Sequence, residues 1–144
     1  MARLDFKDFE DLDAVFSHLA EIPASVKEDA LKAMGTIAAA QIKRSGESMG
    51  VRDPDSDVHI LDTIKMNKPS TTKSGGYLDI TFQGKRTRSG RQTRNAEIAF
   101  VNEYGKRKQK ARPFMGAAME QSADKIANAG AEILWDHVEQ EFSK

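Results

Sequence analysis

The 144-residue chain has no cysteine, which excludes disulfide bonds, thiolate metal ligands and a cysteine nucleophile. Aromatic residues make up only 7% of it, and no apolar run approaches the roughly 18 residues that a membrane-spanning helix requires. The N-terminal residues lack the apolar core of a signal peptide. Apolar residues still reach 39%, enough to bury a core. We therefore expect a single domain, residues 1–144, synthesised in the cytoplasm and without a membrane partner.

The chain has no net charge, but its charged residues are segregated. Residues 85–112 carry ten basic side chains against two carboxylates, whereas residues 1–29 and the segment after Pro113 are acidic. This layout suits self-association, in which basic loops of one subunit meet an acidic face of the next. It equally suits a nucleic-acid partner or a solvated surface. The candidate interface residues are Arg86, Arg88, Arg91, Arg94, Lys106, Arg107, Lys108 and Lys110.

Helical spacing of apolar residues predicts a short helix at about 8–20 and two long helices at about 26–45 and 113–142. Ser25 and Glu28 have the spacing of a capping box at the start of the first long helix, and Ser45-Gly46 with Gly50 are expected to end it. The expected buried positions of the two long helices are Ala30, Leu31, Met34, Ile37, Ala38, Ile42, Met115, Met119, Ile126, Ile133, Leu134, Val138 and Phe142. Around Gly130 the last helix is rich in small residues, which allow another element to pack closely.

Between these helices the hydrophobic pattern changes to a period of two. Tyr77–Phe82 alternates as a half-buried strand does, and Ile64 and Met66 precede it with the same spacing, which predicts a β-hairpin with a long polar loop. Residues 84–95 contain no large apolar side chain and are expected to be a loop ordered only by a partner. Ile98, Phe100 and Val101 are expected to be buried, either as a short helix capped by Asn95 or as a strand.

Together these elements predict an α+β fold. A small antiparallel sheet, formed by the hairpin with its long loop, would pack against two long α-helices, with a short additional helix at the N-terminus.

Patterns typical of catalytic or metal sites are weak throughout the chain. Asp53, Asp55 and Asp57 alternate, but the glycine and the terminal glutamate of a calcium loop are missing. A magnesium-dependent nuclease would rest only on Asp79 and Glu97, whose spacing is loose. His18, His59 and His137 lie far apart with no motif around them. We expect no enzyme activity, no catalytic residue, no cofactor and no metal.

The most informative segment runs from Glu103-Tyr104-Gly105, through a basic loop at 106–110, to Arg112-Pro113-Phe114. Gly105 suits a positive φ that ends a helix or turns a strand, and proline suits a first helical position. Arginine has the wrong sign for a helix N-terminus, so we expect it either to pair with Glu103 or to contact another subunit. Alternatively, Glu103 is a surface charge. Tyr104 would cover an edge of the core.

The order of these pieces resembles the small head–tail joining, or tail-completion, proteins of long-tailed bacteriophages. The chain departs from the family in having a lysine after Gly105 and a long arginine-rich segment before Asn95. The matching positions are Leu61, Ile64, Phe100, Glu103, Tyr104, Gly105, Arg112, Pro113, Phe114 and Ala118.

This resemblance implies a structural virion protein at the head–tail junction, or neck, with no catalytic turnover and no cofactor. Its partners would be copies of itself in a ring of about six subunits, together with the portal-side neck protein and the tail-tube protein. Genomic DNA would pass through the bore without specific binding. Residues 106–110 are the first place to expect a neighbouring subunit. The alternative function is a nucleic-acid-binding module that uses residues 85–112.

Overall fold

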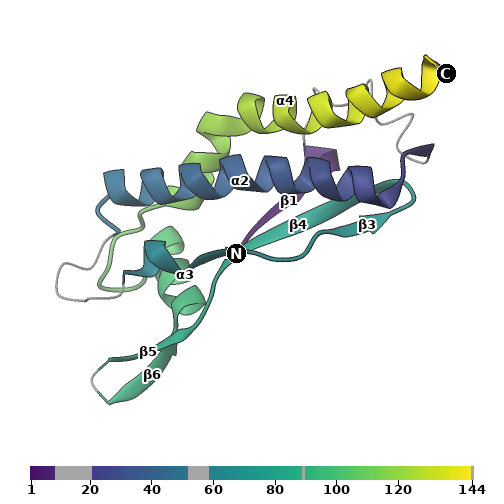
Figure 1. Ribbon diagram of the computed structural model, residues 1–144. Helices are drawn as coiled ribbons and strands as arrows, with labels where there is room; N and C mark the ends of the chain where they lie inside the picture. The colour runs from purple at the N-terminus through teal and green to yellow at the C-terminus, as the bar shows by residue number, and fades with distance from the viewer. Residues whose placement is uncertain (9–20, 52–58, 89, 144) are drawn as a thin grey trace.

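The computed structural model describes residues 1–8, 21–51, 59–88 and 90–143, and it has the expected α+β architecture. Two long helices, α2 (Ala24–Ser48) and α4 (Phe114–Phe142), run antiparallel and pack against each other along one face of an antiparallel sheet (Figure 1). The expected helix at 8–20 lies almost wholly outside the described residues. Before it, the chain forms strand β1 (Ala2–Asp5) and a single 3-10 turn, η1 (Phe6–Asp8). No described helix has the length and apolar character needed to cross a membrane.

Strand β4 (Gly75–Phe82) is the centre of the main sheet. It pairs antiparallel with β1, β2 (Ile64–Met66) and β3 (Ser70–Thr72), and a 3-10 turn, η4 (Ile60–Thr63), precedes β2. Leu78, Ile80 and Phe82 are buried, as their alternation predicts. The hairpin is therefore confirmed. Sequence reasoning missed β1, which has only one fully buried position, Leu4, and is too short to show a period.

Helix α2 starts before and ends after the predicted limits. Its N-cap is Pro23 and no side chain caps it, so the predicted capping box of Ser25 and Glu28 is wrong. Ser45 and Gly46, expected to end the helix, lie buried inside it. A Cβ at Gly46 would lie 2.5 Å from a methyl carbon of Leu61, so this glycine is there for close packing. The turn after the helix falls at Gly50, with φ of +73°.

The core lies between the sheet and the two helices, where α2 and α4 approach closely. A Cβ at Gly130 of α4 would lie 2.5 Å from Met34 Sδ of α2, which fits the small residues predicted there. Ile37, Met119 and Ile133 are only partly buried. The largest fully buried side chains are Leu4, Phe6, Leu31, Met34, Ile42, Leu78, Ile80, Phe114, Ile126 and Leu134.

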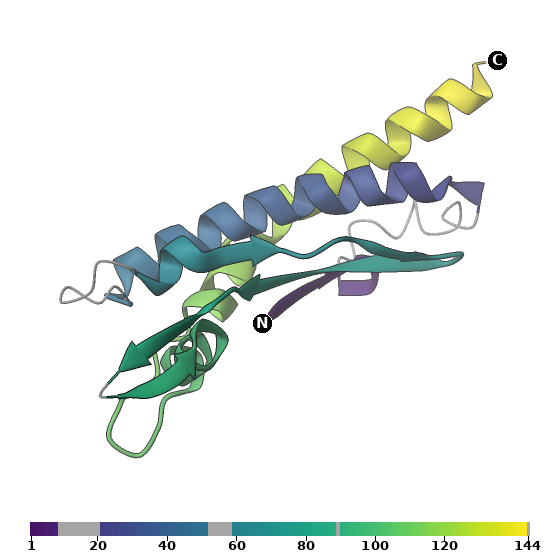
Figure 2. The same cartoon turned by 60° about the horizontal axis from the view of Figure 1, so that its bottom comes forward.

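Residues 84–95 were expected to be a loop, and this expectation is wrong. Lys85–Arg88 and Arg91–Arg94 form a second, two-stranded antiparallel sheet, β5–β6, which turns at Gly90 with φ of +76°. Backbone hydrogen bonds hold this hairpin together without a buried apolar face. Its strands therefore show no alternation of apolar residues from which they could be predicted. Figure 2 shows it projecting from the end of the main sheet, away from the C-terminal half of α4.

Of the two alternatives for the next segment, the helix is observed: α3 (Asn95–Tyr104). Asn95 is its first residue rather than its cap. Phe100 was expected to be buried, but it lies on the outer face of α3 and is 58% exposed. The inward positions of the short helix are Ala99, Asn102 and Glu103 instead.

Candidate interaction surface at the basic end

The basic end, defined here as residues 85–112, consists of β5, β6, α3 and the segment that leads into α4. Gly105 ends α3 with φ of +77°, and its N–H donates to Val101 O at 2.7 Å. A Cβ at this position would lie 2.9 Å from both Gln109 O and Ala111 N. The predicted positive φ is confirmed, and close backbone contacts add a second reason for glycine.

The basic loop after Gly105 is a tight turn. Lys106 N donates to Gln109 O at 2.9 Å, and Gln109 N donates to Lys106 O at 3.0 Å. Arg107 and Lys108 occupy the tip of this turn and are exposed. In Figure 2 the turn projects beside the β5–β6 hairpin, so the basic end presents two adjacent protrusions.

Glu103 caps helix α4. Its side chain accepts the backbone N–H groups of Met115 at 2.8 Å and Gly116 at 2.9 Å, and the residue is only 8% exposed. The first N–H groups of a helix have no partner within the helix and carry its positive end, so they suit a buried carboxylate. Helix α4 begins one residue after Pro113, whose position is the N-cap.

The expected ion pair between Glu103 and Arg112 is therefore wrong. Arg112 Nη1 donates instead to Gly50 O at 3.0 Å, and Arg112 N donates to Asn102 O at 2.6 Å. The carboxylate of Glu103 binds N–H groups at the start of α4, whereas Arg112 donates to a backbone carbonyl in the turn that follows α2. The sequence places Glu103 and Arg112 close to this junction, but it does not reveal which backbone groups bind their side chains.

Asn95 connects the hairpin to α3. Its Nδ2 donates to Gln83 O at 2.8 Å, and its Oδ1 accepts Arg86 Nε at 3.0 Å. This bond fixes the guanidinium of Arg86, whose Nη2 is buried and has no hydrogen-bond partner in the described parts of the chain. Sequence reasoning had proposed Asn95 only as a helix cap and gave it no role in holding a cation.

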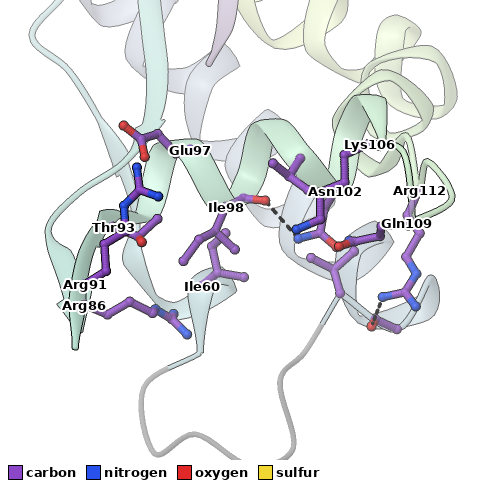
Figure 3. A pocket seen from close by; sticks show the side chains of 13 residues that line it. Ile60, Arg86, Arg91, Thr93, Glu97, Ile98, Asn102, Lys106, Gln109 and Arg112 are labelled. Carbon is purple, nitrogen blue, oxygen red and sulfur yellow. Dashed lines mark hydrogen bonds between the residues drawn. The ribbon is translucent and has the colours of Figure 1, made fainter. Parts of the chain in front are cut away.

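A groove with a cavity volume of about 430 Å³ lies between the hairpin, α3 and the 106–109 turn. Figure 3 shows Arg86 and Arg91 approaching it from the hairpin, and Lys106 and Arg112 from the opposite side. Glu97 is the only carboxylate among the described residues that lines it, and this side chain is already paired with Arg94 at 2.9 Å. The apolar part of the lining is Val51, Ile60, Ile98 and Val101.

A pair of exposed aromatic side chains lies on another face of α3. Phe100 is 58% exposed and Tyr104 is 68% exposed, and their ring centroids are 4.7 Å apart. Tyr104 therefore does not cover an edge of the core. Large aromatic side chains exposed side by side are typical of contact surfaces between proteins.

The acidic counterpart lies on the C-terminal half of α4. We define the acidic stripe as Glu132, Asp136 and Glu139, which are all exposed and share one helix face through their spacing of four and three residues. Figure 1 places this half of α4 at the end of the molecule opposite the β5–β6 hairpin. The two charged surfaces are therefore separated within one chain.

The predicted interface residues are distributed over this end of the molecule. Arg86, Arg91 and Lys106 line the groove, Arg94 binds Glu97, and Arg88 lies in β5. Arg107 and Lys108 form the turn tip, and Lys110 is exposed just after it. Sequence reasoning missed the apolar part of the groove, because Val51 and Ile60 come from a distant part of the chain.

Both carboxylates considered for a nuclease have cationic partners. Asp79 holds Arg3 through two hydrogen bonds of 2.7 and 3.0 Å, and Arg3 lies over the Tyr77 ring at 4.0 Å. Glu97 is paired with Arg94. Within the described ranges no three His, Asp or Glu side chains are grouped as metal ligands would be. His18 and the alternating aspartates at 53, 55 and 57 lie outside those ranges.

Comparison with protein-family models, with curated proteins and with solved structures finds no match to this chain.

Proposed function

We propose that the chain is a structural subunit of the bacteriophage head–tail junction, a head–tail joining or tail-completion protein that assembles into a ring of about six copies. One observation carries this proposal: the basic end and the acidic stripe lie at opposite ends of the same chain. The residues that resemble the family support it, because Glu103, Gly105 and Phe114 together build the junction between α3 and α4.

The separation of the two surfaces suits a ring in which the basic end of one subunit meets the acidic stripe of the next. An antiparallel two-fold dimer, in which each basic end meets the partner's acidic stripe, is the competing arrangement, and the native mass distinguishes the two. A contact between two different patches is heterologous and repeats from subunit to subunit until a ring closes. The exposed Phe100–Tyr104 pair supplies apolar area of the kind that central interface contacts use.

Within the virion, the ring would connect the portal-side neck protein to the tail tube, and genomic DNA would pass through its bore. The β5–β6 hairpin and the Lys106–Gln109 turn are the protrusions that suit contacts with these neighbours. Synthesis would take place in the host cytoplasm. The role needs no catalytic group and no cofactor.

The experiment is negative-stain electron microscopy of the purified chain at low and at high salt, alone and mixed with portal-side and tail-tube proteins. We expect closed rings whose number falls as salt rises, because exposed charges are screened at high ionic strength. A chain that remains monomeric under all these conditions, with and without the partners, would overturn the proposal.

Nucleic-acid binding is a second candidate function, and the four cations around the groove favour it. Phosphate contacts make affinity fall steeply with salt. Filter binding of duplex and single-stranded DNA across a salt series tests this function directly. Micromolar or tighter binding with a steep salt dependence, by a chain that forms no ring, would favour the nucleic-acid-binding module.

A further inference from the structure

We infer that the basic groove is a socket for the acidic stripe of α4 from a second copy of this chain. The inference rests on the proposed function, since it names the two surfaces that meet in the ring. It assigns a partner to the groove and gives the contact a direction, from the C-terminal half of one α4 to the hairpin side of the next subunit.

Arg86 has one fixed and one unpaired guanidinium nitrogen. Asn95 Oδ1 accepts a hydrogen bond from its Nε at 3.0 Å, and its buried Nη2 has no hydrogen-bond partner among the described residues. A guanidinium fixed at one nitrogen and unpaired at another is prepared to bind a carboxylate or phosphate oxygen. Buried donors are nearly always paired in proteins, and an acceptor from a ligand or a water in the groove would satisfy this one.

The basic side chains around the groove lack acidic partners among the described residues. Arg91 and Lys106 have no ion-pair partner among the residues that the structure describes, and Arg112 donates only to a neutral carbonyl, Gly50 O. Glu97 offers little compensation because Arg94 already binds it. Among the described residues, the groove therefore carries more positive than negative charge, which a ligand with several carboxylates would neutralise.

The apolar lining of the groove favours a protein ligand over a phosphate backbone. Val51, Ile60, Ile98 and Val101 give the groove apolar walls, which contribute nothing to binding a bare phosphate chain. The acidic stripe combines carboxylates with apolar surface, because Trp135, next to Asp136, is 36% exposed. A cavity of about 430 Å³ accepts a few side chains from one helix face but not a whole helix.

The length of α4 prevents the acidic stripe from reaching the groove of its own chain. Phe114 lies at the basic end of α4, and Glu132 follows it by 18 residues, which spans about 27 Å of helix. Figure 1 shows that α4 carries this segment away from the hairpin. The stripe can therefore reach a groove only in another copy of the chain.

The absence of cysteine from the chain allows a direct test by disulfide trapping. Thr93→Cys places a thiol in the groove wall, and Asp136→Cys places one in the acidic stripe. We expect a mixture of these two variants to give a cross-linked dimer under mild oxidation. The matched control replaces Asp136→Cys by Glu120→Cys, an exposed carboxylate near the other end of α4, and should give at least about tenfold less cross-link.

Charge reversal provides an independent measurement on the folded chain. Arg91→Glu and Glu139→Arg should each weaken self-association at least about tenfold in sedimentation velocity, and the double variant should recover most of it. Lys32→Glu on the exposed face of α2 is the control and should leave association unchanged. Circular dichroism confirms that each variant is folded.

The outcomes separate this inference from the proposed function. Rings that form normally in every variant, without the Thr93–Asp136 cross-link, would overturn the socket and leave the ring standing. The specific cross-link between chains that form no ring would support the socket and overturn the ring. DNA binding that Arg91→Glu abolishes, with association unchanged and no cross-link, would overturn the socket and assign the groove to nucleic acid.

Discussion

The carboxylate of Glu103 accepts the backbone N–H of Met115 at 2.8 Å, so the last turn of α3 caps the first turn of α4. The neighbouring N–H of Gly116 binds the other carboxylate oxygen at 2.9 Å. This relationship gives a physical role to the Glu-Tyr-Gly segment: its glutamate fixes the start of the long helix, and its glycine turns the chain toward the basic turn. The basic end is therefore joined to α4 at a junction in which Glu103, Phe114 and Met115 are buried.

Replacing Glu103 tests this junction. Glu103→Ala should lower the free energy of unfolding by about 2 kcal/mol, because one buried and one part-buried N–H group lose a charged acceptor. Glu103→Gln keeps one acceptor oxygen and should cost about half as much. Glu97→Ala, which removes an exposed pair with Arg94, should stay within about 0.5 kcal/mol. Urea unfolding measures all three, and equal losses from Glu103→Ala and Glu97→Ala would contradict the capping role.

Gly105 has two requirements that separate variants can distinguish. Gly105→Ala should destabilise the chain by about 2 kcal/mol or more, because it combines a positive φ with backbone atoms 2.9 Å from the added Cβ. Gly90→Ala has the positive φ without close neighbours, so it should cost about 1 kcal/mol. Thermal unfolding should rank the two in this order, and the reverse order would contradict the close approach at Gly105.

The parts of this fold that sequence could predict are those with a local hydrophobic period. Strand β4 shows it in Leu78, Ile80 and Phe82, and α2 shows it in Leu31, Met34 and Ile42. The β5–β6 hairpin has no buried face, so its strands give no such signal. Phe100 was predicted to be buried but is exposed, because α3 is short and turns only part of its surface toward the core.

The candidate site was predictable only in its charges. The cations of residues 85–112 stand out in the sequence, but the groove between them depends on Val51 and Ile60, which pack there from distant positions. The partners of Glu103 and Arg112 are backbone atoms. No side-chain pattern reveals which backbone groups will be free, so a pairing by opposite charge was the natural but incorrect prediction.

Lys27 predicts a pH dependence of stability. It is 3% exposed, its Nζ donates to Thr72 O at 2.7 Å and Lys73 O at 3.0 Å, and burial lowers its pKa below the usual 10.5. The unfolded chain therefore binds this proton more tightly than the folded chain does. Stability contributed by Lys27 should rise with pH between the lowered folded pKa and 10.5.

Lys27→Met is the matched variant, because it keeps an unbranched side chain of nearly the same length and removes the titrating group. The difference in unfolding free energy between wild type and Lys27→Met should shift in favour of wild type as the pH is raised from 8 toward about 10.5. Urea unfolding at a series of pH values measures it. A difference that stays constant or moves in favour of Lys27→Met would contradict the effect of burial.

The exposed aromatic pair should matter for association and not for folding. Phe100→Ser combined with Tyr104→Ser should weaken self-association at least about tenfold, because exposed aromatic side chains are typical energetic centres of interfaces. The same change should alter the free energy of unfolding by only about 0.5 kcal/mol, since neither ring is part of the core. Sedimentation velocity and urea unfolding together separate the two effects, and a large loss of stability without weaker association would contradict this assignment.

The most direct test of the central claim, that unlike surfaces of one chain join head to tail into a closed ring, is the native mass of the purified protein over a concentration series. We predict one dominant closed species of about six copies of the 16.0-kDa chain, with few species between it and the monomer, because a ring gains its last contact only on closure. A population that stops at a dimer would contradict the claim, because a two-fold dimer pairs both ends of each chain and leaves no surface for further copies.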